Sequence, residues 1–183
     1  MNILAEIKQV EASADLLYSK SDVEAAIAKM AEQINLLLSD RNPLILCAMN
    51  GGVVLAGKLL THLTVPLTFD SLNATRYNNS TSGNQITWLQ KPNTSPADRT
   101  VLIVDDILDE GVTLRCIHDF CLEQGATSVY TAVLLDKQLD HPKPIKADFV
   151  GLEVENRYLF GYGMDYKGYL RNAAGIYACK ETY

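Results

Sequence analysis

Residues 101–114 read VLIVDDILDEGVTL, and this stretch decides the fold. Its four leading apolar residues predict a short buried strand that ends in two carboxylates, Asp105 and Asp106. An acidic turn with a glycine follows at 109–111, and an apolar spacing typical of a helix starts at Val112. A strand, a turn and a helix start in this order predict an α/β protein with an anion site, because free backbone N–H groups at a helix start point outward.

The acidity of this stretch restricts the ligand that it can hold. A site for phosphate alone would not carry four carboxylates, because like charges repel. A ligand that has hydroxyl groups and bound Mg²⁺ as well as phosphate removes the conflict, since carboxylates accept hydrogen bonds from sugar hydroxyls or bind Mg²⁺ while backbone amides bind the phosphate. A strand–helix connection with an acidic N-cap is the simpler alternative. The chain contains no GxxxxGK[ST], which excludes a P-loop, and no GxGxxG occurs either.

The stretch resembles the 5-phosphoribosyl-1-diphosphate (PRPP) signature of the type I phosphoribosyltransferases: a hydrophobic strand, two acids, two apolar residues, Asp, then a Gly/Thr turn. The resemblance implies that Asp105 and Asp106 organise the ribose hydroxyls, directly or through Mg²⁺. It makes Asp109 the candidate general base at purine N7. The 5-phosphate would be held by the backbone amides of Glu110, Gly111, Val112 and Thr113. Glu110 stands where Thr or Ser is frequent in the family, so its carboxylate must turn away from the phosphate.

A second motif follows a predicted buried strand at 44–48. Asn50, Gly51 and Gly52 lie between this strand and a helix predicted at 53–63. The glycines would let a ligand approach bare backbone, although a tight connection alone would also need small residues. The position resembles the diphosphate-binding loop of the hypoxanthine-guanine members of the family, commonly Leu-Lys-Gly-Gly, which can hold a non-proline cis peptide. Asn50 replaces the usual lysine, so diphosphate would depend on backbone amides, Mg²⁺ and another basic residue.

A polar segment at 73–87, NATRYNNSTSGNQIT, lacks periodicity and predicts a long loop after a strand at 66–72. Arg76 and Tyr77 lie at its base, where the family's mobile lid usually has Ser-Tyr. The resemblance implies a lid that closes over the diphosphate and excludes water. Trp88 is predicted to pack on the returning strand.

Lys137 follows a strand predicted at 128–135. A lysine at the carboxyl end of a strand in an open α/β sheet faces the ligand crevice. It matches the family's lysine that donates a hydrogen bond to purine O6. Because a lysine cannot accept a hydrogen bond, this residue favours 6-oxopurines over adenine.

The C-terminal segment 155–172, ENRYLFGYGMDYKGYLRN, carries the second strong resemblance. It assigns Tyr158 to stacking on the purine and the backbone of Leu159 to the base edge. Asp165 would lie near the base and a second Mg²⁺, and Arg171 would pair with diphosphate. The alternative is a hairpin whose aromatic rings fill a small satellite core, and we prefer that role for Tyr162, Tyr166 and Tyr169.

Apolar periodicity predicts the remaining elements. A helix capped by Ser21 or Asp22 runs to about Leu38, after one or two helical turns within 1–20. Its inward stripe is Val23, Ile27, Met30, Ile34 and Leu37. Another helix covers 111–123, with Gly125 as its C-cap, and a strand covers 149–154. A Pro-rich loop at 138–147 joins the predicted strands at 128–135 and 149–154, and its His141 is predicted to be a solvent residue.

Composition restricts the class of protein. A chain of 183 residues that is 48% hydrophobic and 21% charged fits one ordered domain. The apolar runs are too short for a membrane span, and acidic residues interrupt the N-terminal stretch where a signal peptide would be apolar. Four cysteines without CxxC or zinc spacing read as reduced thiols in a cytoplasmic protein. The net charge of −6 argues against nucleic-acid binding.

The resemblance spans about 44–172, with four motifs in the expected order. It implies a type I phosphoribosyltransferase fold with a mainly parallel central sheet, flanking helices and a small hood, with the core at about 21–150 and the hood at 1–20 and 151–183. The implied reaction is Mg²⁺-dependent transfer of 5-phosphoribose from PRPP to hypoxanthine or guanine, giving IMP or GMP and diphosphate. The implied assembly is a homo-oligomer, a dimer or tetramer.

Two alternatives stay open. A regulator of the same fold would bind PRPP or a nucleotide without turnover, and it would be expected to lack base-binding or acid/base residues. The presence of Asp109, Lys137 and Tyr158 favours the enzyme. Another nucleobase, such as xanthine or adenine, is the second alternative, because the residue at the 2-position of the base cannot be read from the sequence.

Overall fold

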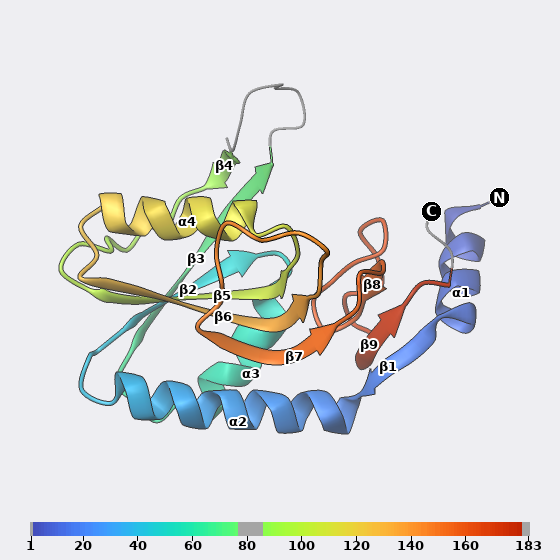
Figure 1. Cartoon of the computed structure of the whole chain (residues 1–183), viewed down its shortest axis with the longest axis horizontal. Coiled ribbons are helices and arrows are strands. Elements are labelled where there is room, and N and C mark those ends of the chain that lie inside the picture. Colours follow the sequence, from blue (N-terminus) through green and yellow to red (C-terminus); the bar gives the residue numbers. More distant parts are fainter. Residues whose placement is uncertain (1, 77–85, 181–183) are drawn as a thin grey trace.

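The computed structural model describes residues 2–76 and 86–180. Its larger sheet has six strands in the order β4-β3-β2-β5-β6-β7 and is parallel except for the edge strand β4. These strands are β2 (Leu44–Met49), β3 (Thr68–Arg76), β4 (Ile86–Gln90), β5 (Thr100–Leu108), β6 (Ser128–Lys137) and β7 (Phe149–Val154). Helices α2 (Lys20–Leu38) and α3 (Val53–His62) cover one face, and α4 (Val112–Glu123) covers the other (Figure 1). The prediction of an α/β fold with a mainly parallel sheet is confirmed.

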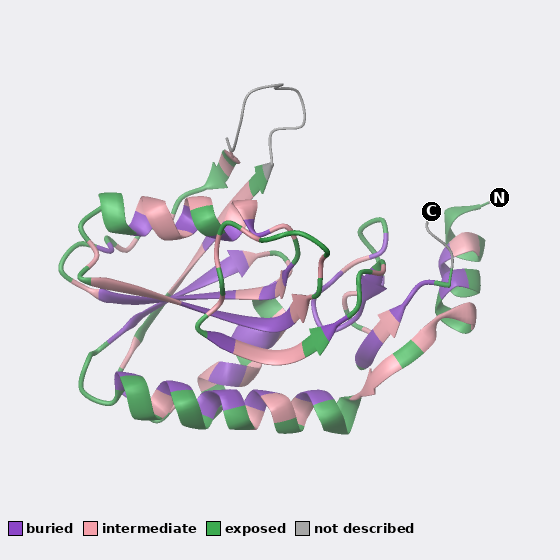
Figure 2. Ribbon diagram, viewed as in Figure 1, coloured by how far each residue is buried: buried purple, intermediate pink, exposed green. Residues whose placement is uncertain are grey.

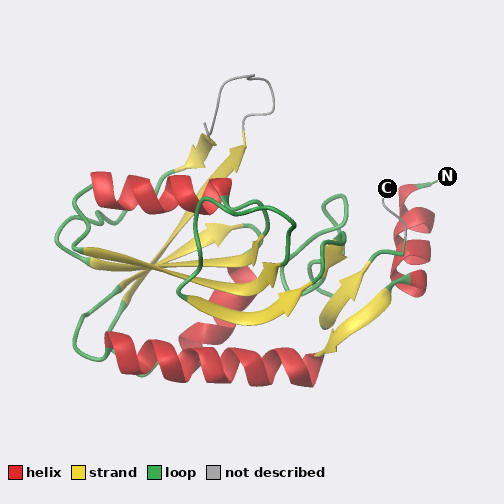
Figure 3. Ribbon diagram, in the orientation of Figure 1, coloured by secondary structure: helices red, strands yellow, loops and turns green. Residues whose placement is uncertain are grey.

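A smaller sheet lies beside the carboxyl ends of the large one. It has the order β1-β9-β8 and is formed by β1 (Asp15–Ser19), β8 (Leu159–Phe160) and β9 (Gly175–Ala178). Helix α1 (Ile3–Ser13) lies at this end of the molecule (Figure 3). We call this part the hood. The division into a core at about 21–150 and a hood stays a proposal, and β7 carries the large sheet on to Val154.

The opening apolar run forms the centre of the large sheet. Side chains alternate along β5, so Leu102 and Val104 pack on the α2/α3 side while Val101 and Ile103 pack on the α4 side. All four are fully buried. A parallel strand covered on both faces needs such a continuous apolar run. Figure 2 shows the resulting buried layer between the helices.

The strand was predicted to end at Val104, and this prediction was wrong. Strand β5 continues to Leu108, and its last residues pair with β6, Ile107 opposite Leu135 and Leu108 opposite Asp136. Asp105 and Asp106 therefore lie inside the strand, held by ladder hydrogen bonds. Polarity at these two positions suggested a strand end because they serve a cavity rather than the core.

Helix α2 ends at Leu38 as predicted, but its start and its inward stripe differ. Ser19 is the N-cap: its hydroxyl accepts from the N–H of Asp22, whose carboxylate accepts from the N–H of Ser19, a complete capping box. The buried stripe ends at Leu38, four residues after Ile34, whereas Leu37 is 37% exposed.

Two further predictions, the helical turns within 1–20 and the long loop at 73–87, were wrong in part. Residues 15–19 form β1 instead of helical turns, because they pair antiparallel with β9 far along the chain. The segment 73–87 is strand at both ends, since 73–76 belong to β3 and pair with 86–90 of β4. The middle of the predicted lid segment, 77–85 with Tyr77, lies outside the described residues, as does the Arg76 side chain. Trp88 of β4 has a packing role, as predicted, and its partner is Phe120 of α4, with ring centroids 4.6 Å apart.

Within the described residues, none of the helices is long and apolar enough to cross a membrane. All four cysteines are free thiols, as predicted.

Candidate active site

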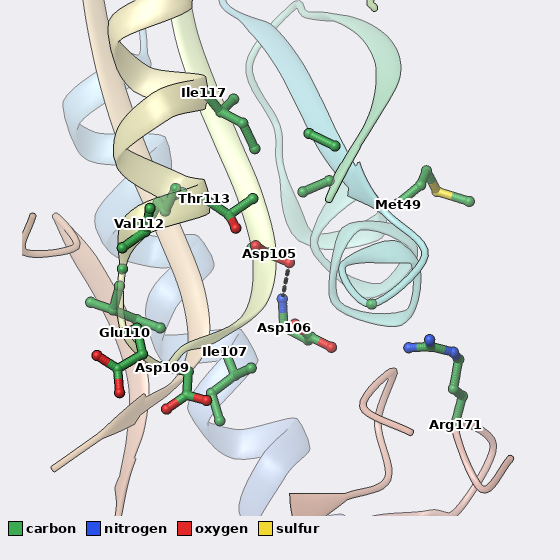
Figure 4. A pocket seen from close by; sticks show the side chains of 16 residues that line it. Met49, Asp105, Asp106, Ile107, Asp109, Glu110, Val112, Thr113, Ile117 and Arg171 are labelled. Atoms are coloured by element: carbon green, nitrogen blue, oxygen red, sulfur yellow. Dashed lines mark hydrogen bonds between the residues drawn. The ribbon is translucent and has the colours of Figure 1, made fainter. Parts of the chain in front are cut away.

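A cavity of about 330 Å³ opens at the carboxyl ends of β2 and β5. It is lined by the segment from Asp105 to Leu114, by Met49 and Gly51, and by Arg171 from the hood (Figure 4). This is the edge at which open α/β sheets bind ligands. The structure therefore brings the predicted PRPP residues other than Asn50 together, although they come from three separate parts of the chain.

The turn after β5 presents backbone donors to this cavity. Gly111 is the N-cap of α4 and has φ +78°, a left-handed conformation that glycine adopts without strain. The amides of the first turn of α4, from Val112 onward, have no acceptor within the helix. Thr113 also lines the cavity. A phosphate group can bind to these donors and to the positive end of the helix dipole.

The Glu110 side chain points away from these donors, as expected, since its carboxylate would repel a bound phosphate. Its carboxylate contacts Nε2 of His141 at 3.0 Å, and Asp140 contacts Nδ1 of the same ring at 2.9 Å. These hydrogen bonds to Glu110 and Asp140 raise the pKa of His141. His141 is exposed to solvent, as predicted, and it also contacts these two carboxylates.

Asp105 and Asp106 lie side by side at the floor of the cavity (Figure 4). The N–H of Asp106 donates to Oδ1 of Asp105 at 2.9 Å. Burial raises the pKa of both carboxyl groups, and repulsion by Asp106 adds to the effect on Asp105. A Cβ atom at position 51 would collide with the carboxylate of Asp106, so any larger residue there would displace the Asp106 side chain. The peptide bond between Met49 and Asn50 is cis, in the loop where the resemblance implies one. Asn50 itself is exposed and is not among the residues that line the cavity.

A second cavity of about 290 Å³ adjoins the first and shares Asp106, Ile107 and Asp109 with it. Its other lining residues are Lys137, Tyr158, Leu159, Met164 and Asp165. All four residues predicted to hold the purine are among them. Ile107 and Met164 were missed, because apolar residues in a strand and a hood loop carry no signal that separates a cavity lining from the core.

Lys137 and Asp109 form an ion pair within the second cavity. Nζ of Lys137 lies 3.1 Å from Oδ1 of Asp109, and the lysine side chain is 11% exposed. A protonated donor and a carboxylate acceptor thus lie next to each other and face the same space. This pair can bind a ligand edge that has an acceptor beside a proton-bearing atom.

The hood completes both cavities. Tyr158 is 42% exposed and offers a ring face, whereas Leu159 is buried in β8. Arg171 pairs with Asp165, with Nη2 2.6 Å from Oδ1, and its Nη1 donates to the carbonyl of Gly163. The other oxygen of Asp165 accepts from the N–H of Gly168. Asp165 and Arg171 are therefore tied to each other in this structure.

The aromatic residues of the hood divide differently than expected. Tyr162 and Tyr166 are buried, and their hydroxyls donate to Glu24 and Glu6. Tyr169 was expected in the same satellite core but is 42% exposed.

The acidic pair fits a magnesium ion. Within residues 2–76 and 86–180, there is no cluster of three or more His, Cys, Asp or Glu residues that could hold a metal. Mg²⁺ is usually bound by one or two carboxylates, with water and substrate phosphates as the other ligands. The carboxylates of Asp105 and Asp106 lie close together, away from water and beside the backbone amides at the start of α4. A bound cation there would neutralise their negative charge. Asp165 could serve a second ion only after release from Arg171.

Comparisons with known proteins agree with this geometry. A family model described as "Phosphoribosyl transferase domain" matches residues 13–167. The chain is 30% identical to the hypoxanthine-guanine phosphoribosyltransferase of Bacillus subtilis, over 91% of the chain and 93% of that protein. It is also 30% identical to the hypoxanthine-guanine-xanthine phosphoribosyltransferase of Tritrichomonas foetus, over 91% and 92%. A solved structure of a Staphylococcus aureus hypoxanthine phosphoribosyltransferase shares the fold, with a TM-score of 0.87 at 22% identity over 93% of the chain and 94% of that structure.

Proposed function

Because this chain belongs to the phosphoribosyltransferase family, we propose that it transfers 5-phosphoribose from PRPP to N9 of hypoxanthine or guanine. The products are diphosphate and IMP or GMP. The observation that carries the proposal is the Lys137–Asp109 pair in the second cavity. This cavity adjoins the first one, which is lined by the start of α4 and by the carboxylates of Asp105 and Asp106. Guanine and hypoxanthine carry O6 and N7 on one edge, so a donor for O6 and a base for N7 must be neighbours.

The first cavity supplies the groups that bind PRPP. Amides from Glu110 to Thr113 bind the 5-phosphate, and Asp105 and Asp106 accept hydrogen bonds from the ribose hydroxyls. The Arg171 guanidinium pairs with the diphosphate, whose departure leaves positive charge on the sugar. Stabilising separated charge is the main task of this reaction, and fixed charges in a closed site do so effectively.

The second cavity supplies the groups that bind and deprotonate the base. Tyr158 stacks on the purine ring, the backbone of Leu159 contacts its edge, and Lys137 donates to O6. Asp109 takes the proton from N7 as N9 attacks C1 of the ribose. A positioned general base typically contributes roughly 10²–10⁴-fold to the rate. The contact between Lys137 and Asp109 opens when the base enters, because the more exposed Asp109 side chain turns toward N7, and both groups then face the purine.

We propose Mg²⁺ as the cofactor, held by Asp105 and Asp106, and Asp165 as a ligand for a second ion. Bound Mg²⁺ would neutralise charge on the diphosphate leaving group and complete the field that Arg171 provides. The residues of the chain then orient the sugar between the leaving group and the base. The loop at Asn50 and Gly51 would bind the diphosphate, and the predicted lid at Arg76 and Tyr77 would close over it and exclude water.

Assembly and location also stay proposals. The family resemblance implies a homo-oligomer, a dimer or a tetramer, which sedimentation at several concentrations would determine. The four free thiols support a reducing, cytoplasmic setting.

The direct test is a spectrophotometric assay of the purified protein with PRPP, Mg²⁺ and each nucleobase in turn. We expect turnover with hypoxanthine or guanine, no turnover with adenine and no turnover in EDTA. Xanthine is included because the residue that contacts the 2-position is not assigned. PRPP binding without turnover on any base would reject the enzyme and favour a regulator of the same fold.

A further inference from the structure

Lys143 lies outside both cavities, yet it contacts the backbone beside the two residues that face the base. It belongs to the connection between β6 and β7, which passes close to the start of α4 (Figure 1). Its Nζ donates to the carbonyl oxygen of Leu108 at 2.6 Å and to Oδ1 of Asp136 at 2.6 Å. Its side chain is 12% exposed. A charged group this far from water is stable only when it is paired and hydrogen-bonded, so both contacts belong to the folded state.

These two partners are opposite each other at the end of the sheet. Leu108 is the last residue of β5, and it is in register with Asp136 of β6. The ammonium of Lys143 therefore spans the final rung between the two parallel strands. The next residue after Leu108 is Asp109 and the next after Asp136 is Lys137, so the ends of both strands lead directly to the pair that is 3.1 Å apart.

We propose that Lys143 is a positioning residue that sets the spacing between Asp109 and Lys137, and hence the fit to N7 and O6 of the purine. This inference rests on the function proposed above. Lys143 acts through Leu108 and Asp136, because it is not among the lining residues of either cavity. Without its ammonium, the two strand ends lose their shared hydrogen-bond donor and the two groups that face the base are no longer held at a fixed separation.

The neighbours of Lys143 support the same role. A Cβ atom on Gly111 would lie 3.4 Å from Pro144 and 3.4 Å from Ile145, so these residues pack against the turn that carries Asp109. Lys143 thus adds a buried polar contact to a connection that also reaches this turn through its apolar residues and through His141.

The test compares Lys143→Met with Lys146→Met. The first removes the buried ammonium and keeps the length of the side chain, and the second removes the same charge from an exposed lysine of the same loop. Turnover is expressed per site able to bind PRPP, determined by calorimetry, so that loss of folded protein does not count. For Lys143→Met we expect kcat/KM for hypoxanthine to fall roughly 10–100-fold, the scale of a small misplacement of reacting groups, while the PRPP Kd changes less than about twofold. Lys146→Met should match the wild type in both.

Asp136→Asn provides a second variant in case Lys143→Met does not fold. This substitution removes the ion pair of Lys143 with Asp136 but keeps the hydrogen bond from Lys143 to the carbonyl of Leu108. We therefore expect a smaller fall in kcat/KM for hypoxanthine, again with an unchanged PRPP Kd. If either folded variant equals Lys146→Met in kcat/KM per PRPP site, the positioning role is rejected. Wild-type protein that binds PRPP but turns over no base would instead reject the proposed function itself.

Discussion

The Asp109–Lys137 pair decides what the site can do. The Asp109 side chain is half-exposed, so it can reach a ligand, whereas Lys137 is nearly buried and has little freedom. In the proposed reaction, an exposed carboxylate beside a nearly buried ammonium suits a purine that is first oriented through O6 and then loses a proton at N7. The two residues therefore have different roles although they contact each other.

Asp109→Asn tests the role of the base. The amide keeps the shape of the side chain but cannot accept a proton, so we expect kcat to fall roughly 10²–10⁴-fold. PRPP binding should change little, because Asp109 is not among the groups that contact the phosphates or the ribose in this proposal. The measurements are steady-state kinetics with hypoxanthine and calorimetry with PRPP. Full activity of the variant would remove Asp109 from the mechanism.

Asp105→Asn tests the cost of the buried carboxylates. Burial and Asp106 hold the pKa of Asp105 well above its ordinary value of 3.8, so the folded protein binds this proton more tightly than the unfolded chain does. The stability that comes from this group is complete below pH 3.8 and is lost as the pH rises through the folded-state pKa. In EDTA at pH 7, we therefore expect the variant to be more stable by roughly 0.5–2 kcal/mol.

The advantage should shrink as the pH falls toward 4, and PRPP binding should be weakened throughout. Urea denaturation across this range gives the difference, with the exposed Asp40→Asn as a control that shows no such gain. A variant that is less stable than the wild type at pH 7 would contradict the assigned cost.

The sequence allowed the polar site residues to be predicted, because a charged side chain at the carboxyl end of a strand has few structural reasons to be there. Asp105, Asp106 and Lys137 are such residues, and each lines one of the two cavities, whereas the uncharged Tyr158 of the second cavity was identified from the family resemblance. Lys143 could not be recognised, since its partners are a backbone carbonyl and a carboxylate that only the sheet register brings within reach.

Helices and strands were predictable where local periodicity matches the burial. The boundaries of α4 and β7 follow from their apolar spacing. Strand β1 was not predictable, because its pairing with β9 joins segments more than 150 residues apart and overrides local preference. The ends of β3 and β4 were also missed, since polar residues there suggested a loop.

The capping box of α2 gives a test of one helix. Ser19→Ala removes the side-chain acceptor for the N–H of Asp22, and we expect the free energy of unfolding to fall by about 1 kcal/mol. Ser39→Ala, at the exposed other end of the helix, is the control and should lie within about 0.5 kcal/mol of the wild type. Urea denaturation measures both. Equal effects of the two substitutions would show that Ser19 is not the effective cap.

The hood and the core form the site together, and the hood is held by contacts between distant parts of the chain. Ile7 and Val10 of α1 pack on Phe160 and Tyr166, and Glu6 accepts hydrogen bonds from Tyr166 and Lys167. The N-terminal helix thus supports the loop that carries Asp165. Sequence patterns could indicate that the C-terminal segment binds a ligand, but not that α1 supports it.

Gly163→Ala tests the contact between hood and core. Gly163 has φ +110°, and a Cβ atom there would collide with the carbonyl oxygen of Gly51, in the loop after β2 that we propose to bind diphosphate. We expect the substitution to lower stability and to weaken PRPP binding at least roughly tenfold, because the hood must move away from the loop. Gly168→Ala is the matched control: its φ is also positive, at +85°, but its Cβ would meet nothing within 4 Å. Calorimetry with PRPP should separate the two, and equal affinities would show that the close approach does not matter.

The central claim is that the turn after β5 binds the phosphate of a nucleotide through its amides while its carboxylates serve hydroxyls and magnesium. The most direct measurement is a crystal structure of the protein with GMP. We predict that the phosphate lies against the amides of residues 110–113, with O6 at Lys137 and N7 at Asp109. A phosphate bound anywhere else would contradict the account.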